Sequence, residues 1–173
     1  MDTEPYSLPE SGDDQPKAIY QRLVDTMPEF EDQKTHEPSV EFLMRNFDLV
    51  EGGRVVLGAV HLPKVQGKLK GVFEWMIERT FGYMPTFLIV LDTHYWQSVG
   101  PREREILIFH EACHMGLKRD KYGEVQEDED GRPRWGLVGH DVEEFTAVVA
   151  RYGAWNGELE GFILAAQNHA PGT

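Results

Sequence analysis

The segment His110–His114 reads His-Glu-Ala-Cys-His, an H-E-x-x-H motif inside a run with helical apolar spacing. Residues four apart lie on one helix face, about 5–6 Å between Cβ atoms, so both imidazoles can bind one ion. Zinc accepts neutral histidine nitrogens and, in catalytic sites, leaves one position for water. Glu111, next to the first histidine, can accept a proton from that water. The motif therefore predicts a helix here, a zinc site, and Glu111 as general base.

A second polar cluster follows downstream and offers a further ligand, since a catalytic zinc usually has three from the protein. His140, expected at the start of the last helix, is the first choice. Glu143 and Glu144 are the alternatives, because they share the helix face of His140. If His140 binds zinc, one of these glutamates is expected to accept a hydrogen bond from a ligand imidazole. Asp141 is expected to cap the helix.

A structural interpretation of the motif, as two core histidines, is disfavoured because buried imidazoles and a carboxylate without an ion need other polar partners. The only cysteine, Cys113, can form no intrachain disulfide and is expected to pack in the core. Candidates for stabilising an oxyanion are Tyr122, Arg151 and Tyr152. The histidines without ligand spacing are expected at the surface or in loops: His36, His61, His94 and His169.

The net charge of the 173-residue chain is -13. This argues against non-specific nucleic-acid binding, which needs clustered lysine and arginine. Lys64, Lys68 and Lys70 form the only short basic run and are expected to be solvated. No run approaches the ~20 apolar residues of a membrane span, and the acidic N-terminus lacks the features of a signal peptide. The expected location is the cytoplasm, that of the host cell if a phage or prophage encodes the chain.

Length and patterning predict a single domain over residues 17–167, between a disordered acidic tail (1–16) and a frayed end (168–173). Helices are expected over 17–27, 67–81, 101–117 and from 141, and strands over 40–45, 54–62 and 86–92. Gly52-Gly53 is expected to turn the chain between the first two strands, which are predicted to form a hairpin or to be adjacent. The polar segment 120–139, with its acidic run 124–130, is either a hairpin or a disordered loop.

The predicted fold class is α+β, with a short, mostly antiparallel sheet packed on the motif helix. A downstream helix is expected to cross the site and supply the last ligand. The predicted chemistry is hydrolysis of a peptide bond, in which Glu111 accepts the proton of a zinc-activated water and passes it to the leaving amine. A protein or peptide is thus the expected partner.

Several segments resemble the phage metallopeptidase family, and the resemblance covers most of residues 17–155. The residues that carry it are Phe87–Leu91, Trp96, Arg102–His114 and His140–Phe145, and the similarity extends back through Gly53–Gly58. The resemblance implies a small zincin-like fold, zinc bound by His110 and His114, Glu111 as base, and a site completed by the downstream segment.

A more distant resemblance is to SprT-like (Spartan-type) proteases, whose third histidine stands in a Gly-His-Gly-x-x-Phe pattern. Gly139-His140 matches it, but Asp141 replaces the second glycine and Phe145 comes one residue late. Two other functions stay open. One is an acidic, metal-stabilised binding or inhibitor protein of the DNA-mimic type, in which a fourth protein ligand closes the site. The other is a zinc amidase of another substrate class.

Overall fold

The computed structural model describes residues 4–142, 146–154 and 156–169. The chain divides into two compact units, residues 1–138 and 139–173, and each is described by itself. Among the described residues, no helix combines the length and apolarity needed to cross a membrane.

The larger unit is built on a mixed four-stranded sheet with the order β1-β2-β6-β5. β2 (Val40–Arg45) and β6 (Phe87–Asp92) run parallel, whereas β1 (Tyr6–Ser7) and β5 (Gly58–His61) are antiparallel to their neighbours. The α+β class is confirmed. Two of the three strand pairings in this sheet are antiparallel, as expected, and the central, longest pairing is parallel.

Gly52-Gly53 turns a small separate ribbon and not the main sheet. The two glycines have φ of 55° and 76° and join β3 (Val50–Glu51) to β4 (Arg54–Val55). The predicted neighbours 40–45 and 54–62 are not paired, because β6 lies between β2 and β5. β6 is a continuous apolar run, and a strand buried on both faces is most stable with a partner on each edge.

Part of the N-terminal segment pairs with the edge of the sheet. Tyr6 and Ser7 pair with the end of β2, and the Tyr6 ring meets that of Phe47 edge-on at 5.5 Å between centroids. The Asn46 amide donates to the carbonyl oxygen of Glu4 at 2.8 Å. These contacts attach the polar N-terminal stretch to the end of β2.

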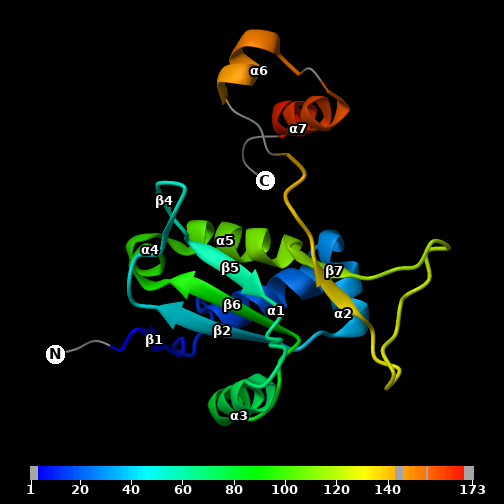
Figure 1. The fold of residues 1–173 in the computed structure, drawn as a ribbon. Coiled ribbons are helices and arrows are strands. Elements are labelled where there is room, and N and C mark those ends of the chain that lie inside the picture. Colours follow the sequence, from blue (N-terminus) through cyan, green and yellow to red (C-terminus); the bar gives the residue numbers. More distant parts are fainter. Residues whose placement is uncertain (1–3, 143–145, 155, 170–173) are drawn as a thin grey trace. The chain divides into compact units, whose positions relative to one another are not determined.

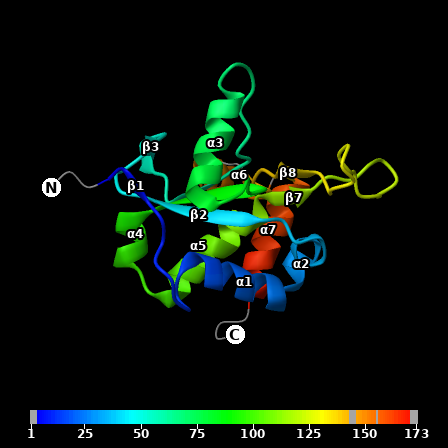
Figure 2. The same cartoon turned by 90° about the horizontal axis from the view of Figure 1, so that it is seen from below.

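Helices cover the sheet unequally (Figures 1 and 2). α1 (Pro16–Thr26) and α5 (Pro101–Cys113) pack together on one face, and α3 (Lys70–Phe81) lies on the other. α3 has no fully buried residue. Short segments η1 (Pro28–Phe30), α2 (Glu31–His36) and α4 (Thr93–Ser98) complete the unit. The most deeply buried core side chains come from α1, β2, β6 and α5: Ile19, Leu23, Phe42, Phe87, Ile89, Leu91 and Ile108.

A buried ion pair joins the ends of β2 and β6. An Arg45 Nη2 atom lies 3.1 Å from Asp92 Oδ2, and both side chains are 2% exposed. Arg45 also donates to the carbonyl oxygens of Phe47 and Val56. The other Asp92 oxygen accepts from the Tyr95 N–H at 2.8 Å and so caps α4. The pair therefore fixes the position at which the chain leaves β6 toward α4 and α5. Through Val56, Arg45 also fixes the segment that leads into β5.

The smaller unit contains α6 (Thr146–Tyr152) and α7 (Gly157–Asn168). α7 was not expected, because Gly157 and Gly161 lower helix propensity. Asn156 offsets this cost, since its side-chain oxygen caps the helix by accepting from the Leu159 N–H at 2.9 Å.

Candidate metal centre

The H-E-x-x-H motif occupies the C-terminal end of α5, as predicted. Pro101 stands in the first turn, where its missing N–H costs no hydrogen bond. The helix ends at Cys113, so the expected extension to residue 117 is wrong. Residues Met115–Leu117 form β7 instead and pair with β8 (Trp135–Leu137). A side chain at Gly116 would meet Val138 at 2.4 Å, which explains why glycine stands in this strand.

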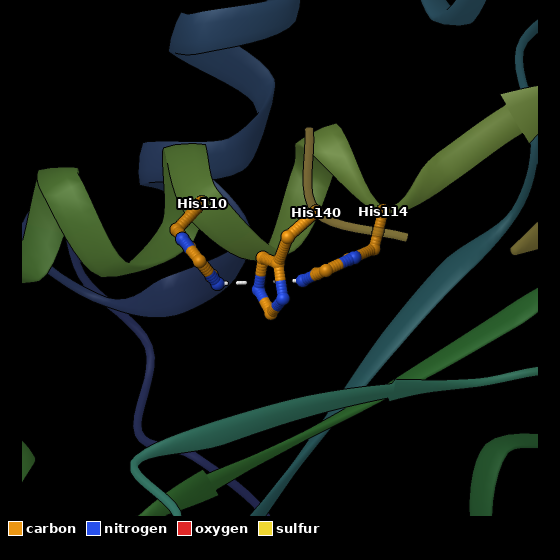
Figure 3. A group of neighbouring side chains, drawn as sticks. All are labelled: His110, His114 and His140. Atoms are coloured by element: carbon orange, nitrogen blue, oxygen red, sulfur yellow. Dashed lines mark hydrogen bonds between the residues drawn. The ribbon is translucent and has the colours of Figure 1, made fainter. Parts of the chain in front are cut away.

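The two motif histidines point their ring nitrogens at each other (Figure 3). Nε2 of His110 lies 3.3 Å from Nε2 of His114, and the ring planes meet at 76°. Two ligands of a tetrahedral zinc, each at about 2.0–2.1 Å from the ion, stand about 3.3–3.4 Å apart. The spacing of the pair thus fits zinc.

A backbone carbonyl selects the tautomer of His114. Its Nδ1 lies 2.6 Å from the carbonyl oxygen of Val138, and the Val138 N–H donates to the His114 carbonyl at 2.8 Å. Because a carbonyl only accepts, Nδ1 must carry the proton, and Nε2 of the neutral ring keeps its lone pair. This is the arrangement that orients metal-binding histidines in proteins.

His140 lies two residues after Val138 and is the second residue of the smaller unit. Two residues span at most about 7 Å of extended chain, so the covalent chain alone keeps His140 near His114. His110, His114 and His140 each offer a ring nitrogen, and these atoms lie within 4.8 Å of one another (Figure 3). His140 precedes α6, so the expected position at a helix start is wrong. The alternative ligands Glu143 and Glu144 lie outside the described residues.

Glu111 lies in a tight pocket between α5 and β5. Its side chain is 3% exposed, and burial raises the pKa of the carboxyl group to about 7, against an opposing effect of His114. A Cβ atom on Gly58 would lie 2.5 Å from Glu111 Oε1 and 2.8 Å from its carboxyl carbon. Only glycine at position 58 therefore leaves room for the carboxylate beside the two imidazoles.

The segment between β7 and β8 is an ordered hairpin arm (residues 118–134), which decides between the two predicted alternatives. The backbone N–H groups of Lys118, Gln126 and Arg134 each donate to a carbonyl of another of these three residues, at 2.8–2.9 Å. Asp120 and Asp128 each accept two backbone N–H groups and so close the two turns. The hydrogen bond from the Arg132 N–H is the main cause of a lowered pKa at Asp128.

Other candidate residues lie apart from this centre or differ from expectation. Cys113 is exposed, so its predicted core position is wrong. Tyr122 is 77% exposed on the hairpin arm. A second group with ligand-like spacing, Asp48, Asp92 and His94, is explained by other contacts. Its central carboxylate is held by Arg45, and His94 Nδ1 lies 3.2 Å from Asp48.

Sequence reasoning missed two residues that shape this centre. Gly58 leaves room for Glu111 because it has no side chain, and Val138 accepts the hydrogen bond of His114 with its backbone carbonyl. Neither residue type carries a recognisable motif.

The family model described as "Putative phage metallopeptidase" matches residues 11–167 of the 173-residue chain. No curated protein and no solved structure matches. The family match spans both the motif helix and the downstream histidine segment. The chain therefore belongs to the phage metallopeptidase family.

Proposed function

We propose that this protein is a zinc-dependent peptidase of zincin-like fold, with zinc bound by His110, His114 and His140 and with Glu111 as general base. Membership of a metallopeptidase family supports a metal and a protein or peptide substrate. The observation that carries the proposal is the 3.3 Å spacing of two ring nitrogens beside a buried carboxylate.

Zinc bound there would polarise the peptide carbonyl and lower the pKa of a water molecule to about 7. Glu111 then accepts a proton from the attacking water and returns it to the leaving amine. Its burial suits this task, because a pKa near neutrality lets one carboxylate both take up and release a proton. His114 is held by Val138, so the ring keeps one orientation throughout.

The position of β5 supports an extended peptide as substrate. β5 is the last strand of the sheet among the described residues, and it contacts Glu111 through Gly58. An edge strand presents backbone N–H and C=O groups, to which an extended peptide can pair as an added strand. A peptide bound along β5 would run past the catalytic carboxylate.

The proposal is tested by zinc content and cleavage of a mixed peptide library. The wild-type protein is expected to contain about one zinc ion, as a single catalytic site requires. Cleavage should stop on treatment with a chelator and return when zinc is added. Zinc without any cleavage would favour the acidic binding protein, and a chain that never binds zinc would contradict the metal site itself.

Gly58→Ala is expected to slow cleavage by about 100-fold while zinc remains bound, because the added methyl group displaces the Glu111 carboxylate. The measurements are kcat and zinc content. Gly71→Ala is the matched control, since that exposed glycine of α3 has no atom within 4 Å of the added Cβ. If both variants were equally active, the space at Gly58 would not be needed to place the Glu111 carboxylate.

A further inference from the structure

A buried amide contacts the turn at which α5 ends. Gln33 of α2 is 5% exposed, and its Nε2 donates to the carbonyl oxygen of Ala112 at 2.9 Å and to that of Met115 at 3.4 Å. These carbonyls stand on either side of Cys113 and His114. One side chain from another helix thus holds both ends of the turn that carries the second motif histidine.

Tyr20 supplies the donor for the oxygen of this amide. The Tyr20 hydroxyl, on a side chain 7% exposed, donates to Gln33 Oε1 at 3.1 Å. Burial raises the pKa of the phenol, so it stays a neutral donor. If the amide rotated by half a turn, Oε1 would face two carbonyl oxygens, which only accept, and both hydrogen bonds to the turn would be lost. The two carbonyls therefore hold Nε2 toward the turn, and the Tyr20 hydroxyl donates to the amide oxygen on the other side.

The chemistry of the turn explains why the residue is glutamine. The last carbonyls of a helix lack donors within the helix, and here the chain passes directly from α5 into β7. Only a primary amide offers two N–H donors and one acceptor at the end of a flexible chain. Glutamate has no donor when ionised, and lysine and arginine have no acceptor for Tyr20.

We infer that Gln33, held in place by its hydrogen bond to Tyr20, is a positioning residue that sets the backbone of the turn and so places His114 at ligand distance from His110. The inference rests on the proposed zinc site. Val138 holds the same histidine through its ring and its carbonyl oxygen. The second motif histidine is thereby fixed from two elements, α2 and the end of β8.

The test measures zinc affinity of the full chain by competition with a coloured chelator, and the absorption spectrum of the cobalt-substituted protein. Gln33→Met removes all three hydrogen bonds at similar volume and is expected to weaken zinc binding about 10-fold and to change the cobalt spectrum. Gln33→Glu keeps the acceptor for Tyr20 but turns a carboxylate toward two carbonyls, so its loss should be larger. Tyr20→Phe should give a smaller loss in the same direction.

Ser39→Ala is the control for a general loss of stability. It removes the hydrogen bonds of Ser39 with Thr86, which join the starts of β2 and β6 and do not involve α5. This variant should lower the unfolding temperature but leave zinc affinity and the cobalt spectrum unchanged.

The inference is overturned if Gln33→Met and Tyr20→Phe keep wild-type zinc affinity and cobalt spectra, or if Ser39→Ala weakens zinc as much as they do. Should Gln33→Met not fold, Tyr20→Phe alone decides, because it removes a single hydroxyl. A wild-type protein that binds no zinc would instead contradict the proposed function. The two failures are therefore distinguishable.

Discussion

Glu111→Gln is expected to bind zinc as the wild-type protein does and to cleave peptides about 1,000-fold more slowly. Glutamine has nearly the same shape as glutamate, so it fits the pocket against Gly58, but its amide cannot accept the proton of the attacking water. The histidines 110 and 114 keep their spacing, so the metal is retained. The measurements are zinc content and kcat/KM on a peptide that the wild-type protein cleaves.

Glu103→Gln is the matched control, because Glu103 lies in the first turn of the same helix and is exposed. It makes the same chemical change far from the motif, and it should keep wild-type activity. If Glu111→Gln cleaved as fast as this control, Glu111 would not be the general base.

Asp92→Asn is expected to lower the free energy of unfolding by about 3–5 kcal/mol, because it leaves the Arg45 guanidinium buried without a counter-charge. The amide keeps the volume and can still cap α4, so the loss reports the charge. Arg45→Met combined with Asp92→Asn should lose less than the sum of the two single changes. Chemical denaturation of all three variants gives these values.

An exposed ion pair provides the comparison for this prediction. Arg22 and Glu105 lie 3.2 Å apart with 47% and 42% of their side chains exposed. Water screens such a pair, so Glu105→Gln should change the free energy of unfolding by less than about 1 kcal/mol. A loss at Asp92→Asn as small as this would show that the buried pair does not hold the sheet end.

The sequence predicted the elements with strong periodicity but not how strands pair. Helices at α1, α3 and α5 and strands at β2 and β6 lie where the apolar spacing predicts them. The order of the sheet was missed, because a turn such as Gly52-Gly53 is a local signal and the parallel pairing of β2 with β6 joins segments far apart in the chain. Strand pairing depends on burial of whole faces, which no local pattern encodes.

In the candidate site, too, one part could be predicted from the sequence and another could not. The H-E-x-x-H spacing places His110 and His114 on one helix face, and the structure brings their nitrogens together. The shape around them was not predictable. The pocket of Glu111 depends on the missing side chain of Gly58, and the turn at His114 depends on Gln33, 81 positions away from it along the chain. Contacts of this kind arise only when the chain is folded.

The pairing of β7 with β8 makes the spatial distance between two site residues independent of their separation along the sequence. His114 and Val138 are 24 residues apart in sequence but share two hydrogen bonds in space. Insertions or deletions within the arm 118–134 change the number of residues between His114 and Val138. They leave the contact between these two residues unchanged, provided that β7 and β8 keep their alignment. Relatives with shorter or longer arms should therefore preserve the same imidazole geometry, and no fixed residue count can define this centre.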